Sequence, residues 1–169
     1  MKVLKWVTRE YVHVDRTACP WLIKRFIDPK AEFIFVPSEK MPEIVKKEKA
    51  IPYDAPSVEL GHHGNKCSFD AFVKKYKIKD PALLELANIV RAADTDKPEA
   101  IEAAGLDAVM TGISIVAKDD HEAIEKARPV YDAFYTFCRL KLLRQKYKTE
   151  IEKMDRKGMR EFLRKKLSE

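Results

Sequence analysis

The apolar positions of this chain follow strand-like spacing near the N-terminus and helical spacing through most of the remainder. Short runs rich in β-branched and aromatic residues at 2–7 and 32–36 predict strands. The stretch 17–29 has apolar residues at helical spacing and ends at a proline, so it predicts a helix between these strands. Residues 51–53 and 58–60 are candidates for two further short strands.

From residue 68 onward the spacing is helical almost to the end. We expect helices at 69–76, 82–93, 98–116, 119–151 and 154–167, and a short charged helix at 42–49. A glycine, Gly105 or Gly112, should break the third of these helices, and Pro129 should kink the fourth. The pattern predicts one domain over residues 1–169. Its fold class is α+β and predominantly helical: a small N-terminal β-sheet packs against a helical bundle with long C-terminal helices.

Composition limits the classes of function. The chain has 169 residues and is 46% hydrophobic, enough for a packed core. Its net charge of +6 is concentrated after residue 139, where lysine and arginine outnumber acids about two to one. Without interleaved aromatics or a phosphate-binding glycine loop, this basic segment predicts a solvated helix face and does not favour nucleic-acid binding. A long amphipathic C-terminal helix could instead support a homodimer.

The cellular location is also constrained. Three scattered cysteines are typical of a reducing compartment. The N-terminal segment 1–7 is too short and too charged for a signal peptide, and no apolar run is long enough to cross a bilayer. We therefore expect a cytoplasmic protein without a membrane anchor.

Residues 61–70 combine several types of metal-ligating side chain in ten positions. His62, His63, Cys67 and Asp70 supply imidazole nitrogen, thiolate sulfur and carboxylate oxygen. Proteins build transition-metal sites from these atoms. The alternative is a polar turn whose histidines face water and whose cysteine is simply buried.

Two further helical segments bring polar groups together. His121, Glu125, Arg128, Asp132 and Tyr135 are spaced four, three, four and three residues apart, which places them on one helix stripe. The stripe predicts either part of a metal site or an exposed ladder of charges. Asp94 follows an apolar helix, so its carboxylate should lie at the edge of the core and need a cation, and Asp96 should cap the next helix.

The first predicted helix is preceded by Asp15 and Arg16 and contains Arg25. The two arginines could form a fork that binds an oxyanion, because guanidinium groups bind such anions through paired hydrogen bonds. The alternative is a pair of ion pairs, such as Asp15 with Arg25 or Arg16 with Asp28. Cys19, expected in the first turn of this helix, is a candidate redox thiol or a small buried residue.

Several motifs occur together in a recognisable order. They are Trp6-Val7-Thr8-Arg9-Glu10, the segment 15–29, Gly61-His62-His63-Gly64, Cys67-Ser68-Phe69-Asp70, the segment 89–96, Asp119-Asp120-His121 and Tyr131-Asp132-Ala133. In this order the chain resembles the chromate-resistance domain at the C-terminal end of ChrB-type proteins. The resemblance covers about residues 3–140, and residues 141–169 form a charged helical extension outside it.

The resemblance and the residue chemistry together imply a divalent transition-metal site for Fe, Mn or Zn. We expect His62, Asp94 and His121 as ligands, with His63, Cys67 and Asp70 as additional members. The acids expected to orient the ligands from outside the site are Asp15, Glu125 and Asp132. Arg16 and Arg25 would then face a small oxyanion or another small-molecule ligand.

Two functions fit these expectations, and a third hypothesis needs no metal. The first is a chromate-resistance-associated metal protein with redox or hydrolytic activity. The second is a non-catalytic sensor or sequestering module for chromate or a metal, which acts through a protein partner. In the third, the polar residues form only a network of ion pairs.

Overall fold

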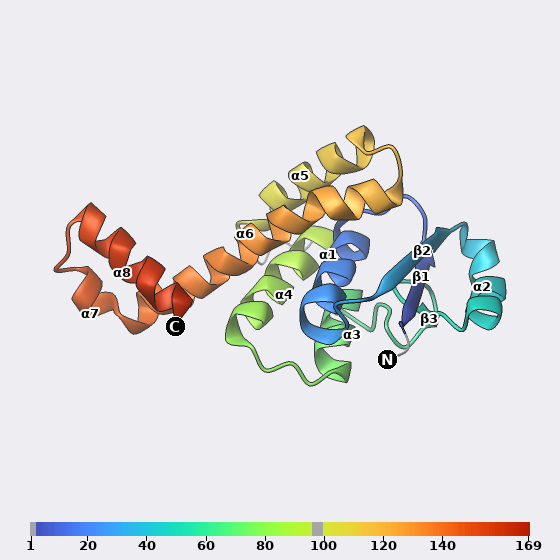
Figure 1. Ribbon diagram of the computed structural model, residues 1–169, viewed down its shortest axis with the longest axis horizontal. Coiled ribbons are helices and arrows are strands. Elements are labelled where there is room, and N and C mark those ends of the chain that lie inside the picture. The colour runs from blue at the N-terminus through green and yellow to red at the C-terminus, as the bar shows by residue number, and fades with distance from the viewer. Residues whose placement is uncertain (1–2, 96–99) are drawn as a thin grey trace.

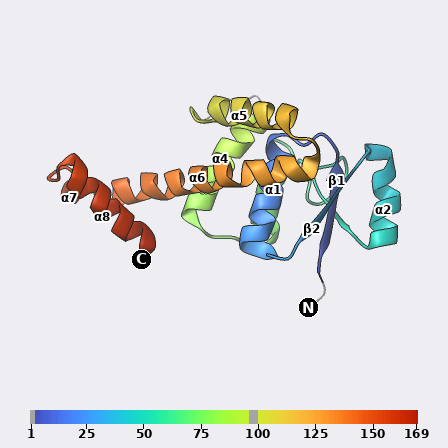
Figure 2. The same ribbon diagram turned by 45° about the horizontal axis from the view of Figure 1, so that its top comes forward.

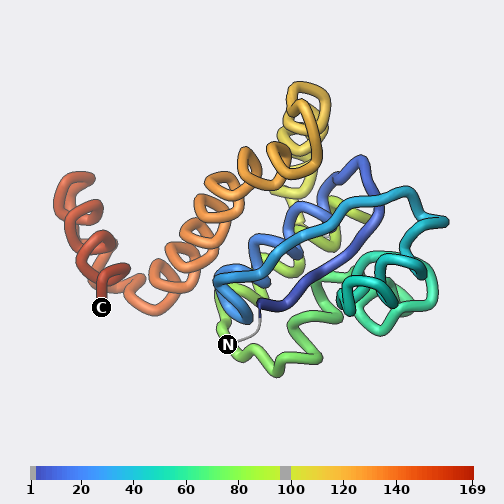
Figure 3. The backbone as a smooth tube through the Cα atoms, turned by 45° about the vertical axis from the view of Figure 1, so that its right-hand side comes forward, coloured from blue at the N-terminus to red at the C-terminus, as the bar shows by residue number. Residues whose placement is uncertain are grey.

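A small parallel sheet forms the N-terminal part of the fold in the computed structural model, which describes residues 3–95 and 100–169. Strands β1 (Lys5–Arg9), β2 (Glu32–Val36) and β3 (Ile51–Pro52) lie in the order β2-β1-β3. Trp6 pairs with Phe33 on one side and Ile51 on the other. Figure 3 shows β1 and β2 running side by side. The strand predicted at 58–60 is reduced to a single bridge between Tyr53 and Leu60.

Both faces of this sheet are covered, as is usual for parallel strands. Because side chains alternate along a strand, Trp6 points into the main core, whereas Val7 packs with Met41 of helix α2 (Met41–Glu48). Helix α1 (Val14–Leu22) lies on the opposite side of the sheet from α2 (Figures 1 and 2). The sheet therefore separates a small cluster under α2 from the larger helical core.

Helix α1 begins three residues before the predicted start and contains Pro20 in its interior. It continues into a π-helical turn, η1 (Ile23–Ile27), and ends before Pro29. Cys19 is therefore past the first turn and fully buried, and burial raises the pKa of its thiol well above the usual value. Of the two interpretations of Cys19, the structure therefore matches the small buried residue and not a reactive redox thiol.

The remaining helices form the bundle and its extension. They are α3 (Ser68–Lys75), α4 (Pro81–Asp94), α5 (Ala103–Val116), α6 (Asp120–Lys146), α7 (Lys148–Ile151) and α8 (Arg156–Ser168), and η2 (Ser38–Lys40) is a 3-10 turn. The α+β, predominantly helical fold class is confirmed. No helix in the described ranges combines the length and apolar character needed to cross a membrane.

Local sequence signals account for several helix boundaries. Asp80 caps α4 by accepting a hydrogen bond from the Leu83 amide (3.0 Å), and Pro81 occupies the first helical position. Helix α5 continues through both Gly105 and Gly112, so the predicted break at one or the other is wrong. Helix α6 also continues through Pro129 but ends at Lys146, earlier than predicted. The capping prediction for Asp96 lies outside the described residues.

Helices α1, α4 and α6 pack against one another around fully buried Tyr131. The Tyr131 hydroxyl donates a hydrogen bond to the Val14 carbonyl (2.9 Å). At the end of α6 away from the sheet, α7 and α8 fold into a hairpin that projects from the bundle (Figure 1). Arg139 donates to the carbonyl of Leu167 (2.7 Å) and fixes α8 against α6.

Candidate metal centre

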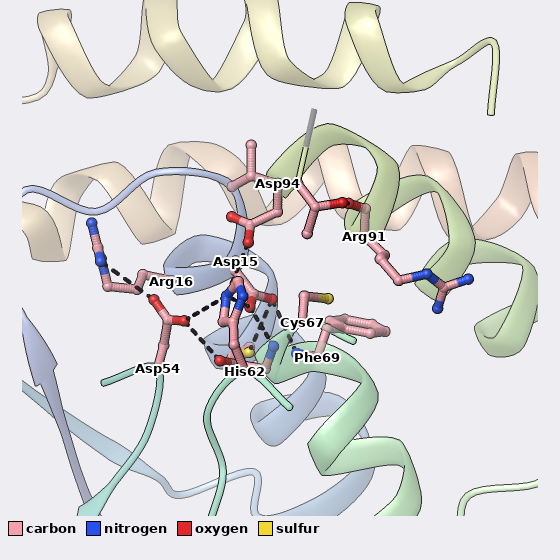
Figure 4. A network of polar contacts seen from close by, with 12 residues as sticks. Asp15, Arg16, Asp54, His62, Cys67, Phe69, Arg91 and Asp94 are labelled. Atoms are coloured by element: carbon pink, nitrogen blue, oxygen red, sulfur yellow. Dashed lines mark hydrogen bonds and ion pairs between the residues drawn. The ribbon is translucent and has the colours of Figure 1, made fainter. Parts of the chain in front are cut away.

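Three carboxylates converge on one imidazole nitrogen between α1, α3 and α4 (Figure 4). The Nε2 atom of His62 lies 3.1 Å from Oδ2 of Asp94. The same nitrogen lies 3.3 Å from Oδ1 of Asp54 and 3.4 Å from Oδ2 of Asp15. A single N–H group cannot donate good hydrogen bonds to three oxygens at once. The cluster therefore contains more acceptors than His62 can satisfy.

Asp15 is fixed by the N-terminus of α3. Its carboxylate oxygens accept hydrogen bonds from the backbone amides of Ser68 (2.6 Å) and Phe69 (3.0 Å). These amides are free to donate because the first turn of a helix has no preceding carbonyl to bond. The carboxylate is only 1% exposed, and within residues 3–95 and 100–169 no lysine or arginine pairs with it.

Asp54 and His62 come from the irregular segment between β3 and α3. Asp54 has a left-handed backbone conformation (φ 45°), and its amide donates to the carbonyl of Leu60 (2.9 Å), which closes the segment into a loop. At Gly61 a Cβ atom would lie 2.7 Å from the carbonyl oxygen of Ala55. Glycine is therefore required there for the chain to approach itself and direct His62 toward the carboxylates.

Asp54 also connects the cluster to an arginine. Its Oδ1 atom accepts a hydrogen bond from the Ser68 hydroxyl (2.7 Å), and Oδ2 accepts one from the guanidinium of Arg16 (3.3 Å). Burial opposes ionisation of Asp54. The hydrogen bonds from His62 and Ser68, together with Arg16, outweigh it and lower the pKa of this carboxyl.

The other groups of the cluster have pKa values shifted toward their protonated forms. Hydrogen bonds to Asp15 and Asp54 raise the pKa of His62 from 6.5 to about 10. Burial, with repulsion from the neighbouring carboxylates, raises the pKa of Asp94 to about 7. Burial also raises the pKa of Asp15. In the absence of a metal, protons therefore partly offset the crowded negative charge.

The spacing of these atoms suits a single metal ion. Asp15, His62 and Asp94 each offer one ligand atom, and the three atoms lie within 4.8 Å of one another. Two ligands that are each about 2.1 Å from a tetrahedral ion lie roughly 3.4 Å apart. The His62–Asp94 and His62–Asp15 distances of 3.1 and 3.4 Å are close to that value. The side chain of His62 is 47% exposed, so the cluster is open to solvent on one side.

The structure brings together only part of the predicted ligand set. His62 and Asp94 meet as expected, and Asp15, predicted to act from outside, lies in the ligand group itself. His121 lies elsewhere: it is exposed, and its ring packs edgewise on Phe35 of β2, with 5.0 Å between centroids. Helix α6 directs its buried face toward α1 and leaves His121 outside that contact.

Two other members of the 61–70 stretch, Cys67 and Asp70, form the N-terminal cap of α3. Cys67 is the N-cap of this helix and is fully buried, and burial raises the pKa of its thiol. Asp70 accepts a hydrogen bond from the Cys67 amide (3.1 Å) and pairs with Arg91 (2.6 Å). His63 points away and contacts the carbonyl of Glu59 through Nε2 (2.8 Å). None of these three belongs to the group of closely spaced ligand atoms.

The predicted oxyanion fork is divided between two places. Arg16 lies beside the cluster through Asp54, whereas Arg25 pairs with Asp132 (2.8 Å) and lies over the ring of Tyr135. Asp132 also accepts a hydrogen bond from the indole of Trp21 (2.9 Å). Asp28, proposed as an ion-pair partner, instead caps the turn that follows it through the Lys30 amide (3.0 Å).

Glu125 and Asp132 therefore do not orient the imidazole of His62. Glu125 pairs with Lys24 (3.5 Å) and Arg128 (3.5 Å) at the surface. The helical stripe therefore forms ion pairs with Lys24 and Arg25 of η1 and one pair within α6, as in the alternative interpretation of that pattern. Asp54 was missed because it is an isolated acid in the sequence. Its position directly after the short strand β3 is the one signal that could have indicated it, because polar groups at the carboxyl ends of parallel strands commonly form sites.

The sheet, the helical bundle and the cluster define an α+β protein with a carboxylate-rich histidine site. The chain belongs to the family of the ChrB C-terminal domain, whose model matches residues 6–138. Protein ChrB of Cupriavidus metallidurans is 30% identical over 135 residues, which cover 78% of this chain and 40% of that relative. The match therefore spans less than half of the relative's length. No solved structure shows significant similarity to this chain.

The family comparison confirms the resemblance seen in the sequence and connects the chain to ChrB-type chromate-resistance proteins. All four residues of the cluster, Asp15, Asp54, His62 and Asp94, lie inside the matched range. Helices α7 and α8 lie outside it.

Proposed function

We propose that the protein contributes to chromate resistance by binding one divalent transition metal between Asp15, His62 and Asp94. The observation that supports this most directly is the convergence of three carboxylates on Nε2 of His62 at 3.1 to 3.4 Å. Arg9 and Arg16 pair with Asp54, so one imidazolium is left to balance two acids, the buried Asp15 and the half-buried Asp94. A divalent cation would neutralise them and use the same atoms as ligands.

The donor set limits the identity of the ion. One imidazole with carboxylate oxygens suits Fe, Mn or Zn, whereas a soft ion would require thiolates. Cys19 and Cys67 are buried with raised thiol pKa values, so they remain protonated near the cluster. The site therefore favours a metal that accepts nitrogen and oxygen ligands.

We further propose that the site is catalytic and supports redox or hydrolytic chemistry. Three protein ligands leave a coordination position for water or a small oxyanion, and the exposed edge of His62 gives access from solvent. The bound metal would act as a Lewis acid or change oxidation state. Arg16 lies next to Asp54 at the margin of the cluster and would attract an anionic substrate.

The competing proposal is a sensor or sequestering module, and one observation favours it. Asp54 lies 3.3 Å from the same nitrogen and is almost fully buried. If Asp54 also bound the metal, four protein ligands would close the coordination shell, as in structural sites. Such a domain would bind the metal or chromate and transmit the change to a protein partner.

A cytoplasmic location is part of the proposal. Cys19, Cys67 and Cys138 are all free and buried, which is typical of proteins kept in a reducing compartment.

Metal content and affinity test the ligand assignment. Protein purified without chelator should contain near-stoichiometric metal, and the apoprotein should bind added Mn²⁺ or Zn²⁺ in calorimetric titrations. His62→Ala and Asp94→Asn should each weaken binding at least tenfold, because each removes a ligand. His63→Ala and His121→Ala are matched controls and should bind like the wild type. Wild-type affinity in His62→Ala, or equal losses in the controls, would refute the assignment.

A second measurement separates the catalytic proposal from the sensor. Mn²⁺ prefers six ligands, so the relaxation of solvent protons is enhanced in proportion to the coordination positions that the protein leaves to exchanging water. Enhancement that increases in Asp54→Ala would indicate that Asp54 occupies a coordination position in the wild type. Enhancement that is already large and unchanged in Asp54→Ala would support the open, catalytic site.

A further inference from the structure

The motif Asp119-Asp120-His121 contributes no residue to the metal cluster, but its second acid makes a long-range contact. Asp119 caps α6, and His121 lies at the surface. Asp120 instead reaches the turn between β1 and α1. Its two carboxylate oxygens accept hydrogen bonds from the backbone amides of Tyr11 (3.0 Å) and Val12 (2.9 Å). The start of α6 is therefore fastened to the turn that leads into the cluster.

The turn that Asp120 holds is strained. Tyr11 has a left-handed backbone conformation (φ 60°), which a residue other than glycine adopts only against steric repulsion. Packing of the Tyr11 side chain does not offset this repulsion, because the residue is 82% exposed. Such conformations persist only where the surrounding structure imposes them. The two hydrogen bonds to Asp120 impose it from the amide side of the turn.

The carbonyl side of the same turn is held by Arg16. The Nη2 atom of Arg16 donates a hydrogen bond to the carbonyl oxygen of Tyr11 (3.1 Å), and Nη1 donates to Oδ2 of Asp54 (3.3 Å). Figure 4 shows the contact with Asp54 at the edge of the cluster. Within residues 3–95 and 100–169 the Nε atom of Arg16 is buried without a hydrogen-bond partner. The position of the guanidinium therefore depends on Tyr11 and Asp54.

A second arginine, Arg9, holds a different part of Asp54. Its Nε and Nη2 atoms donate hydrogen bonds to the backbone carbonyl of Asp54 (3.2 and 3.1 Å), whereas Nη2 lies 3.6 Å from Oδ2 of the carboxylate. Arg9 therefore fixes mainly the backbone, and Arg16 fixes the Oδ2 side of the carboxylate. The other oxygen, Oδ1, accepts a hydrogen bond from the Ser68 hydroxyl and faces His62.

The charge of Arg16 influences how Asp54 responds to a bound metal. Because Oδ1 of Asp54 lies 3.3 Å from Nε2 of His62, a metal held by His62 would be within reach of this carboxylate. A buried carboxylate without a cation of its own would be drawn onto a divalent ion. A carboxylate that is already paired with a guanidinium gains less from such a move. Arg16 therefore favours three protein ligands over four.

We propose that Asp120 is a positioning residue of the metal site, which keeps Arg16 on Asp54 and thereby leaves a coordination position open. Without Asp120 the strained turn relaxes and Arg16 loses the carbonyl of Tyr11. Asp54 then turns to the metal as a fourth ligand. This role rests on the proposed metal-binding function and adds to it a residue of α6 that touches neither the ligands nor the metal.

Proton relaxation with Mn²⁺ fully bound to the full chain tests the proposal, because the enhancement reports the number of exchanging water positions. With three protein ligands the wild type should keep about three of six positions for water, so Asp120→Ala should lose about one third of the enhancement. Asp120→Ala combined with Asp54→Ala should recover the wild-type enhancement, because the added ligand is gone. A general loosening of the fold would not be reversed in this way.

Three further variants separate positioning from destabilisation. Asp119→Ala is the matched control: it removes the cap of α6 but leaves the contacts of the turn in place, so it should keep the wild-type enhancement. Arg16→Gln should lower the enhancement as Asp120→Ala does, and the two changes together should lower it no further. Asp120→Asn keeps one acceptor oxygen and should give an intermediate loss, which serves as the test if Asp120→Ala does not fold.

Several results would contradict this role of Asp120. Unchanged enhancement in both Asp120 variants, an equal loss in Asp119→Ala, or a loss that persists when Asp54 is also removed would each overturn it while leaving metal binding intact. A wild type that binds no Mn²⁺ would instead refute the proposed function, and the positioning role with it.

Discussion

Replacing His62 with glutamine should destabilise the metal-free protein in a pH-dependent manner. The imidazole stands between Asp15, Asp54 and Asp94, and their hydrogen bonds raise its pKa from 6.5 to about 10. For a fully buried histidine, a pKa shift of this size corresponds to a contribution of about 5 kcal/mol to the free energy of unfolding. Because the side chain is 47% exposed, water screens the interaction, and we expect a contribution of about 1–2 kcal/mol.

The sign of the pH dependence follows from proton linkage. A histidine whose pKa is higher in the folded state binds its proton more tightly there than in the unfolded chain. Its stabilisation is complete below the unfolded value of 6.5 and is lost as the pH rises toward about 10. His62→Gln should therefore be less stable than the wild type at about pH 6 and nearly equal to it at about pH 10.

Urea denaturation with a chelator present measures this difference, and the buried tryptophans Trp6 and Trp21 report unfolding by fluorescence. His63→Gln is the control. It alters an exposed neighbouring histidine outside the cluster, so its effect should be small and the same at both pH values. The electrostatic reasoning would be refuted if His62→Gln and the wild type had the same free energy of unfolding at about pH 6. It would also be refuted if they differed by the same amount at both pH values.

Four further outcomes follow from the same contacts. Metal binding near pH 7 should release roughly one to two protons, mainly from His62 and partly from Asp94, as calorimetry in buffers of different ionisation enthalpy would detect. Asp15→Ala should lower the free energy of unfolding by about 2–4 kcal/mol in urea melts, since it leaves two buried amides of α3 without an acceptor. Asp94→Asn should instead stabilise the metal-free protein by about 1 kcal/mol at about pH 8, a gain that disappears as the pH falls toward 3.8, because burial disfavours the ionised carboxyl. The buried thiols should not react with a disulfide reagent at neutral pH until the protein unfolds, and rapid reaction of Cys67 in the folded state would contradict its burial and raised pKa.

The sequence predicted most of the secondary structure because the signals for it are local. Apolar spacing indicates which positions face a core, and residues such as Asp80 and Pro81 mark a helix start without reference to the rest of the fold. The two main strands, the helical remainder and the family were therefore accessible from the residues alone. Errors in the helices arose where local rules have exceptions, as at Pro20 within α1 and at the two glycines of α5.

For the candidate site too, the sequence was informative only where the signal is local. The sequence indicated His62 and Asp94, because a histidine between glycines and an acid at the end of an apolar helix are locally unusual. It wrongly included His121 among the metal ligands. The spacing of His121 from Glu125 and Asp132 fits a stripe of metal ligands and a ladder of surface charges equally well. Helical spacing determines which residues share a face, but it does not specify which element that face contacts.

The meeting of Asp15, Asp54, His62 and Asp94 was decided by tertiary structure alone. These residues come from α1, the loop after β3, the segment before α3 and the end of α4, and no short-range pattern connects them. Their distances depend on how α1 packs against α3 and α4, and on the close approach of the chain at Gly61. The sequence by itself determined which elements form and which side chains carry chemistry. The folded chain determined which of those side chains meet, because packing between distant segments sets their separation.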